Sequence, residues 1–185
     1  MVTVPVCLTK GGKFELLPVY SECVTDLFEA IVESKDHVSL WMPWCHPDYS
    51  VDEARRWVDS RSEAWAQGKE YSFLIIDSRS KKIVGGCELN HLHETYLFAN
   101  LGYWVRTSRT REGAATEATL LLSEFGFCVL NLVRIEIVIA VGNVASERVA
   151  EKAGAFREGI LRNRLIHRGE VKDAYMFSLL PSIGP

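Results

Sequence analysis

The residues best suited to bind an anion lie between a predicted strand and a strongly apolar helix. The strand ends near Val105, the helix begins near Ala115, and the loop between them carries Arg109, Arg111 and Gly113. The first backbone N–H groups of a helix have no partner inside it, and with the helix dipole they attract anions. Gly113 lets the backbone approach a ligand closely, and the arginines supply charge suited to phosphate. We therefore expect a phosphate site here, with a plain glycine turn and solvated arginines as the alternative.

A carboxylate on an otherwise apolar predicted strand is a second candidate for chemistry. Glu88 lies within residues 82–91, and Asn90 shares its strand face because side chains alternate along a strand. Such an acid is unusual unless it is paired or faces a cavity; a solvent-facing edge position is the alternative. His91 and His93 follow, and either could accept a proton instead, since unperturbed histidine titrates near pH ~6.5. Two histidines without further ligands at matching spacing do not predict a metal site.

Aromatic side chains gather in residues 40–48, which we expect to form an ordered loop. The loop carries Trp41, Trp44 and His46. Tryptophan is amphipathic and commonly half-buried, so the two indoles either line a binding pocket or pack the loop itself. Farther along, Asn143 follows an interior strand and is expected to turn the chain into the next helix.

The elements that must hold these residues alternate between strand and helix patterns. Strands are predicted over residues 4–17 (broken near Gly11), 71–76, 82–91, 96–105, 133–141, 156–167 and 174–180. Helices are predicted over residues 21–33, 50–68, 115–130 and 145–153, with Ser21 and Ser50 as N-caps of the first two. An antiparallel run followed by strand–helix alternation predicts an α+β fold, a mixed, mostly antiparallel twisted sheet with helices on both faces.

The composition narrows the class of protein. A chain of 185 residues fits one domain, residues 1–185, with enough apolar side chains for a sizeable core. The net charge of −3 gives no general attraction to nucleic acid, and no apolar run is long enough to span a membrane. No basic stretch followed by an apolar run marks a secretory signal. Five widely spaced cysteines without a CxxC pair favour reduced thiols in a cytoplasmic protein.

Several motifs, in order along the chain, resemble the GNAT acetyltransferase superfamily. The loop around Gly113 resembles its motif A, Arg/Gln-x-x-Gly-x-Gly/Ala, which binds the pyrophosphate of coenzyme A. Nearly the whole chain resembles one branch, which acetylates the N-terminal serine or alanine of ribosomal proteins. The segments that carry this resemblance are Trp41-Met-Pro-Trp-Cys-His, Leu101-Gly-Tyr-Trp, Ala115-Thr-Glu-Ala, Gly142-Asn-x-x-Ser146, Glu151-Lys-Ala-Gly154 and Phe156-Arg-Glu-Gly-Ile-Leu.

The resemblance implies an enzyme that transfers the acetyl group of acetyl-CoA to a primary amine, directly in a ternary complex and without a metal. Pantetheine would lie like an extra strand between residues 82–91 and 96–105, which would splay apart and present backbone N–H groups to the thioester carbonyl. Relatives are often dimers, so a homodimer is a further expectation. The implied cofactor-binding residues are Trp104, Val105, Arg109, Thr110, Arg111, Gly113, Ala114, Ala115 and Asn143.

Acetyl transfer to an amine needs a proton acceptor and a donor for the thiolate, because the amine attacks only as the free base and an alkylammonium has a pKa near ~10. Glu88 is the expected base, since many GNAT enzymes place a glutamate on this strand. Ser146 matches a serine that the branch uses as general acid; a hydroxyl that only caps the helix start is the alternative. The expected acceptor-binding residues are Trp41, Trp44, His46, Asn90 and His91.

The sequence departs from the family pattern at two places. Aligned on Gly113, the motif begins at Thr110, and it has Arg111 where glycine is common and Glu112 where a basic residue is common. A glutamate there should repel a pyrophosphate unless its side chain points to solvent. A glutamate that the branch uses as base aligns near Leu165, so that role is missing.

The function stays open between three interpretations, two of which differ in the acceptor amine. A protein or peptide α-amine is favoured by the resemblance and by its pKa near ~8, which lies below the ~10.4 of lysine. A small amine, such as a polyamine, an amino acid or an antibiotic, would suit an acidic pocket to which Glu88, Glu94 and Asp48 could contribute. A non-catalytic acyl-CoA-binding sensor would account for the irregular loop and the missing glutamate.

Overall fold

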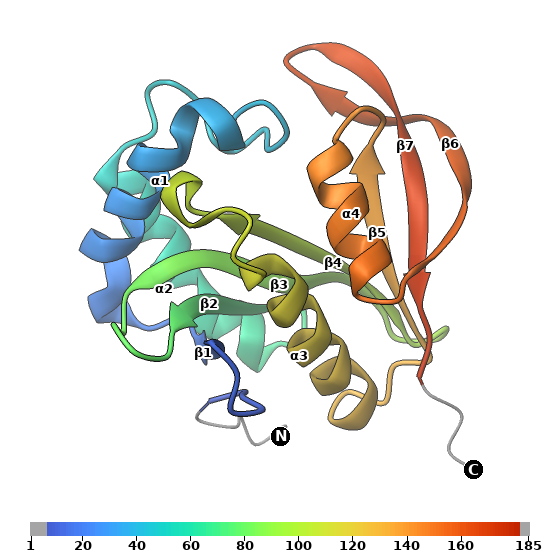
Figure 1. Ribbon diagram of the computed structural model, residues 1–185, viewed down its shortest axis with the longest axis horizontal. Coiled ribbons are helices and arrows are strands. Elements are labelled where there is room, and N and C mark those ends of the chain that lie inside the picture. The colour runs from blue at the N-terminus through green and yellow to red at the C-terminus, as the bar shows by residue number, and fades with distance from the viewer. Residues whose placement is uncertain (1–6, 182–185) are drawn as a thin grey trace.

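The computed structural model describes residues 7–181 and is drawn as a ribbon in Figure 1. Its strands are β1 (Phe14–Pro18), β2 (Tyr71–Asp77), β3 (Ile83–His93), β4 (Phe98–Val105), β5 (Arg134–Ala140), β6 (Phe156–His167) and β7 (Glu170–Leu179). Its helices are α1 (Val24–Val38), α2 (Val51–Ala66), α3 (Ala114–Cys128) and α4 (Val144–Lys152), with short 3-10 helices at Ser21–Cys23 and Thr107–Arg109. None of the helices described has the length and apolarity that a membrane crossing requires.

The strands described form one open sheet in the order β1-β2-β3-β4-β5-β7-β6. Neighbouring strands are antiparallel except β4 and β5, which run parallel because the crossover between them passes through α3. The α+β fold with a mixed, mostly antiparallel sheet, predicted from the order of elements, is therefore confirmed.

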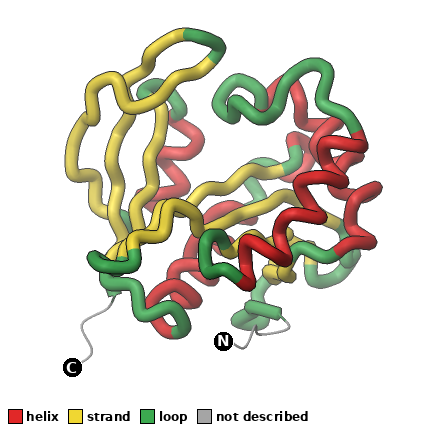
Figure 2. Tube along the Cα trace, turned by 180° about the vertical axis from the view of Figure 1, so that it is seen from behind, coloured by secondary structure: helices red, strands yellow, loops and turns green. Residues whose placement is uncertain are grey.

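Helices cover both faces of this sheet, as Figures 1 and 2 show from opposite sides. On one face, Phe125 of α3 packs in a core with Phe73 of β2. On the other face, Leu27 of α1 and Val58 of α2 pack in a second core with Leu74, the next residue of β2. Successive side chains of a strand point to opposite faces, so β2 is buried along its whole length, which explains its largely apolar sequence.

Ser50 caps α2 as predicted, whereas the predicted cap at Ser21 is wrong. The Ser50 hydroxyl accepts a hydrogen bond from the N–H of Glu53, and the Glu53 carboxylate accepts one from the N–H of Ser50, which makes a reciprocal capping box. Ser21 instead begins a 3-10 turn and its hydroxyl donates to the neighbouring carboxylate, so α1 begins only at Val24 and runs on to Val38.

The first predicted strand is much shorter in the structure. β1 covers only Phe14–Pro18, and Leu8 makes an isolated bridge to Leu16. The chain bends between them where Gly11 has a left-handed φ of 76°, a conformation that a residue without Cβ adopts easily. The break predicted near this glycine is confirmed, and residues 4–6 of the predicted strand lie outside the described residues.

The sheet opens between β4 and β5, so the predicted splaying of β3 from β4 is wrong. Residues 85–90 of β3 stay paired with residues 100–105 of β4, because a short hairpin connection holds these strands in register. β4 and β5 pair only over residues 98–100 and 134–136 and then separate. Since the long connection through α3 does not force them to stay together, β5 turns away and continues its pairing with β7.

Candidate active site

A cavity of about 590 Å³ lies where β4 and β5 separate. Its walls come mainly from β3, β4 and β5, from α1, α2 and the loop between them, and from the start of α4, with single residues of β2 and β6. Among the residues singled out in the sequence, those that line it are Trp41, Trp44, His46, Glu88, Asn90, Trp104, Asn143, Ser146 and Leu165, the position at which the branch glutamate is missing. The opening of the sheet therefore brings together residues that lie far apart in the chain.

Glu88 lies on β3 and lines this cavity. Its two carboxylate oxygens accept hydrogen bonds from the Ser72 hydroxyl at 3.3 Å and from the Asn90 side-chain amide at 2.7 Å. Asn90 in turn accepts a hydrogen bond from Asn100 at 2.9 Å. Burial raises the pKa of Glu88, and the nearby Glu70 carboxylate adds to that effect. A carboxylate with a raised pKa is a stronger base, so this environment suits proton transfer.

β4 supplies two residues to which the sequence assigned no position in the site. Gly102 is the direct cross-strand partner of Glu88, and a Cβ at Gly102 would meet Glu88 Cγ at 3.9 Å, so a longer side chain there would lie against the acid. The Tyr103 hydroxyl donates to the backbone carbonyl of Ser146 at 3.0 Å, and burial raises the pKa of this tyrosine. Both residues lie in the run ending at Trp104, and pairing that run with the Glu88 strand would have found them.

The start of α4 brings Ser146 to the cavity. Asn143 is the N-cap, because its side-chain oxygen accepts a hydrogen bond from the N–H of Ser146 at 3.2 Å. The prediction that Asn143 turns the chain into this helix is confirmed. The alternative in which the Ser146 hydroxyl caps the helix is wrong, since the cap is three residues earlier, and this leaves the hydroxyl for the cavity.

The loop between α1 and α2 gives the cavity an aromatic wall. Trp44 packs edge-on against Trp104 and Tyr49, with ring centroids 6.0 and 5.9 Å apart. His46 Nε2 lies 2.9 Å from Glu53 Oε1, and this hydrogen bond lowers the pKa of Glu53. Burial raises the pKa of Tyr49 to about 12, so its hydroxyl stays protonated. Trp44 remains 40% exposed, so its packing leaves indole surface free.

His91 does not line the cavity, in contrast to its predicted role in acceptor binding. It sits where the pairing of β3 shifts register, its φ is 51° and its side chain is exposed. Simple alternation along the strand fails at such an irregularity. His93 stacks on Tyr96 and Phe98, with ring centroids 4.6 and 5.0 Å apart. Among residues 7–181, no group of three or more His, Cys, Asp or Glu side chains could hold a metal ion.

The loop before α3 has the backbone of an anion site. Gly113 is the N-cap of α3 with a φ of 90°, and Arg111 is also left-handed with a φ of 64°. Within the described chain no acceptor takes a hydrogen bond from the N–H groups of Gly113, Ala114 or Ala115. These groups are therefore free to bind an anion. The remaining predicted ligands beside this backbone are Val105, at the end of β4, and Thr110, whose hydroxyl donates to the Thr107 carbonyl at 3.0 Å.

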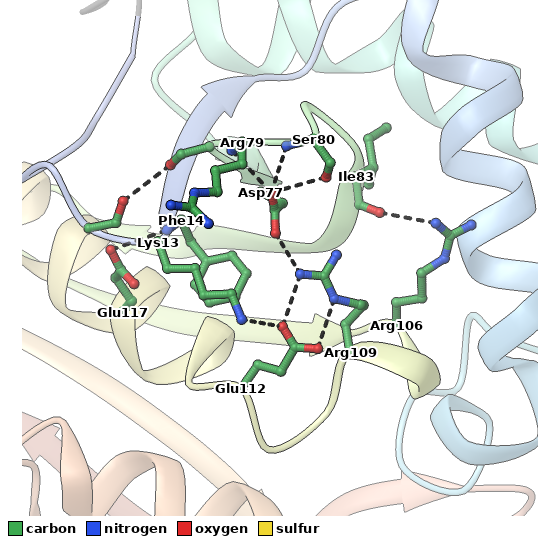
Figure 3. Close-up of polar contacts among 12 residues, drawn as sticks. Lys13, Phe14, Asp77, Arg79, Ser80, Ile83, Arg106, Arg109, Glu112 and Glu117 are labelled. Atoms are coloured by element: carbon green, nitrogen blue, oxygen red, sulfur yellow. Dashed lines mark hydrogen bonds and ion pairs between the residues drawn. The ribbon is translucent and has the colours of Figure 1, made fainter.

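The charged side chains of this loop differ in how they are engaged. Arg109 donates to Asp77 at 2.6 Å and to both carboxylate oxygens of Glu112 at 2.9 Å (Figure 3). Glu112 also accepts from Lys13 at 2.6 Å, so two cations neutralise the carboxylate that the sequence led us to expect would repel a pyrophosphate. Arg111 is exposed. The groups of this loop that remain uncommitted are therefore its backbone N–H groups and Arg111, and not Arg109.

Comparison with known proteins agrees with this geometry. Residues 14–155 match the family model described as the acetyltransferase (GNAT) domain. The chain is 31% identical over 134 residues to the uncharacterized N-acetyltransferase p20 of Bacillus licheniformis, which covers 72% of this chain and 75% of p20. The solved structure of RimL, a ribosomal L7/L12 α-N-protein acetyltransferase in complex with coenzyme A, has a TM-score of 0.87 at 20% identity, covering 94% of this chain and 97% of RimL.

Two further relatives are named for different acceptors. The ribosomal-protein-serine acetyltransferase of Escherichia coli K12 is 24% identical over 148 residues, covering 80% of this chain and 82% of that protein. The spermidine N(1)-acetyltransferase of the same strain is also 24% identical, over 139 residues, covering 69% and 73%. These likenesses agree on the group transferred and differ on the amine that receives it. The chain thus belongs to the GNAT acetyltransferase family, and it is an acetyl-CoA-dependent N-acetyltransferase.

Proposed function

We propose that the enzyme acetylates the α-amine at the N-terminus of a protein or peptide, by direct transfer while donor and acceptor are both bound. The observation that carries this proposal is that Glu88 and Ser146, a candidate base and a candidate acid, line one cavity at the opening between β4 and β5. The same cavity has the indoles of Trp41 and Trp44 on its wall, which offer surface to an extended peptide.

The donor is held mainly by backbone groups. The free N–H groups at the start of α3 bind the diphosphate, since a helix N-terminus favours negative charge. Residues 101–105 of β4 have no described strand partner on the side from which β5 turns away, so pantetheine can lie along this edge. Trp104 and Val105 end that edge, and Asn143 lines the cavity where β5 ends. This arrangement brings the thioester to the carboxyl group of Glu88.

Glu88 acts as the general base. As the nitrogen of the free amine attacks the thioester carbonyl carbon, Glu88 takes the proton that the nitrogen loses, directly or through water, and later releases it to solvent. A C–N bond forms, the C–S bond breaks, and the Ser146 hydroxyl gives a proton to the departing thiolate and regains one from solvent. The raised pKa of Glu88 and the uncommitted hydroxyl of Ser146 support these roles.

An α-amine is the acceptor that needs the least help from this site to lose its proton. Its pKa near ~8 lies more than two units below the ~10.4 of lysine, so a larger fraction is already the free base at neutral pH. Glu53 is engaged by a hydrogen bond to His46, whereas Glu88 accepts hydrogen bonds from neutral groups only. A polycation would find one carboxylate on these walls, Glu88, that is not already hydrogen-bonded to a histidine.

A small amine such as a polyamine is the second candidate, favoured by the spermidine acetyltransferase among the relatives. Two of the acidic residues that could have served it, Asp48 and Glu94, are exposed and do not line the cavity. Glu53 and Glu88 do line it, so a short diamine keeps two carboxylates to approach.

Competition at equal concentration decides between these acceptors. A peptide that begins with Ser or Ala, the same peptide with a blocked N-terminus and an internal lysine, and spermidine are offered with acetyl-CoA, and the products are separated by mass. We expect the free N-terminus to be acetylated first. A strong preference for spermidine or for the blocked peptide would reject the α-amine while leaving the acetyltransferase intact.

A further inference from the structure

Four charged side chains form a cluster beside the loop that precedes α3 (Figure 3). Arg109 Nη2 donates to Asp77 Oδ2 at 2.6 Å, and Arg109 Nε and Nη2 each donate to one oxygen of Glu112 at 2.9 Å. Lys13 Nζ donates to Glu112 at 2.6 Å. Two cations balance two carboxylates, so the cluster offers no net charge to an anionic ligand.

The cluster is anchored by the turn between β2 and β3. Asp77 Oδ1 accepts hydrogen bonds from the N–H of Arg79 at 3.1 Å, from the N–H of Ser80 at 2.8 Å and from the Ser80 hydroxyl at 3.0 Å. The side chains of Asp77 and Arg109 are only 10% and 22% exposed, so their contact is screened less than an ion pair on the surface. Asp77 therefore holds the Arg109 guanidinium in a fixed place.

Glu112 is the point at which the cluster reaches the loop backbone. It lies between Arg111 and Gly113, whose φ angles of 64° and 90° are both left-handed. A residue with a side chain is disfavoured in this conformation, so the surrounding contacts must hold Arg111 there. The same stretch of backbone orients the free N–H groups at the start of α3.

We propose that Arg109 is a positioning residue for the diphosphate of acetyl-CoA: held by Asp77, it fixes Glu112 and with it the left-handed backbone whose N–H groups receive the diphosphate. The diphosphate is assigned to this loop by the proposed function, so the role of Arg109 rests on that function. Glu112 is then a structural partner and not a repelling charge. Hydrogen bonds from Arg109 and Lys13 lower the pKa of Glu112 to about 2, so the cluster persists at any ordinary assay pH.

Glu112→Gln separates this role from simple repulsion. If Glu112 only repelled the phosphates, its neutralisation would lower KM for acetyl-CoA. If Glu112 holds the loop, KM rises several-fold and kcat at saturating acetyl-CoA stays within about twofold. Arg109→Gln should raise KM about tenfold or more, and Arg109→Lys should not restore it, because an ammonium cannot bridge both carboxylate oxygens as the guanidinium fork does.

S-acetylpantetheine is the matched donor, because it lacks the diphosphate and the adenosine. We expect its kcat/KM to agree within about twofold between the wild type and the variants at Arg109 and Glu112. Arg79→Gln is the charge control, because it removes the same charge from an exposed side chain on the adjoining turn. It should leave the kinetic constants for both donors unchanged.

An unchanged KM for acetyl-CoA in Arg109→Gln, a lower KM in Glu112→Gln, or an equal loss with both donors would overturn the positioning role. Should the Arg109 variants not fold, Glu112→Gln alone decides, since it keeps the size of the side chain. Gly113→Asp separates this proposal from the function beneath it. If Gly113→Asp binds acetyl-CoA normally, the diphosphate does not bind this loop at all. If Gly113→Asp loses acetyl-CoA binding while Arg109→Gln keeps a normal KM, only the role of Arg109 is rejected.

Discussion

The loop before α3 and the cavity between β4 and β5 differ in whether their carboxylates are paired with cations. In the loop each carboxylate has a cation, and hydrogen bonds lower the pKa of Glu112 to about 2. In the cavity the carboxyl group of Glu88 receives hydrogen bonds from neutral groups only, and burial raises its pKa. Carboxylates paired with cations hold a geometry and titrate only in acid, whereas an unpaired, partly buried carboxyl group can exchange a proton at a useful pH. We therefore expect positioning at the loop and chemistry in the cavity.

Removing the unpaired carboxylate should have the largest effect. Glu88→Gln keeps the size of the side chain and an acceptor oxygen for Ser72 or Asn90, but it cannot accept a proton. We expect turnover to fall roughly 10²–10⁴-fold, the usual scale for a general base. The loss should shrink at high pH, where more of the amine is already deprotonated.

The pH profile of kcat/KM tests the assignment of Glu88 as the base, whatever the size of the loss in turnover. Burial raises the pKa of Glu88, so the wild-type rate should fall as pH drops through that raised value, and the variant should lack this limb. A variant that kept the wild-type profile would contradict the role of Glu88 and leave water or another group of the cavity as the proton acceptor, since neither His91 nor His93 lines it.

Placing an unpaired charge in the loop is the second test. In the wild type, acetyl-CoA at 100 times its Kd should stabilise the fold by about 2.7 kcal/mol, because a ligand selective for the folded state acts by mass action. Gly113→Asp sets a carboxylate at the anion site and should abolish the shift in Tm. Gly154→Asp is the control, since Gly154 also has a left-handed φ, 83°, with open space around it. Its shift should be retained, and a full shift in Gly113→Asp would remove the diphosphate from this loop.

Ser146→Ala should have a smaller effect, confined to catalysis. We expect turnover to slow by about 10–100-fold, at or below the lower end of the range for a general acid, with acetyl-CoA affinity preserved. Stability should not change, because the cap of α4 is the Asn143 side chain. Asn143→Ala is the counterpart and should lose about 1 kcal/mol of folding free energy. If turnover were intact in Ser146→Ala, the thiolate would have to take its proton from another donor.

Local patterns predicted the elements well and their partners poorly. The largely apolar run of β2, the apolar period of α2 and the residue types at the Ser50 cap identified these features, because they depend on neighbours in sequence. The place where the sheet opens depends on which connection is short, and periodicity does not carry that information. Alternation also failed at His91, where β3 shifts register, since the shift depends on its pairing with the neighbouring strand.

The loop illustrates the same limit for a functional residue. When only its neighbours in sequence are considered, Arg109 is predicted to bind phosphate. Its guanidinium is engaged by Asp77, which lies 32 residues earlier and comes close only through the sheet. No local spacing links the two, so the change from ligand to positioning residue needed the structure. Glu88 could be singled out from the sequence because an acid on an apolar strand is unusual whatever its partners.

The smallest effect is expected where a paired charge is removed from the cluster. Asp77→Asn keeps Oδ1 as the acceptor for the N–H groups of Arg79 and Ser80, and it removes both the charge opposite Arg109 and the second oxygen that accepts the Arg109 hydrogen bond. Because that contact is partly exposed, we expect a loss of about 0.5–1.5 kcal/mol at pH 7, measured by denaturant unfolding. The hydrogen bonds hold the pKa of Asp77 well below its ordinary value, so its contribution is present above an unfolded pKa near ~3.9 and fades as pH falls toward the depressed folded value. The gap between wild type and variant should close in acid. A gap independent of pH would mean that the amide fits the turn badly, and that the charge of Asp77 adds nothing to the loop.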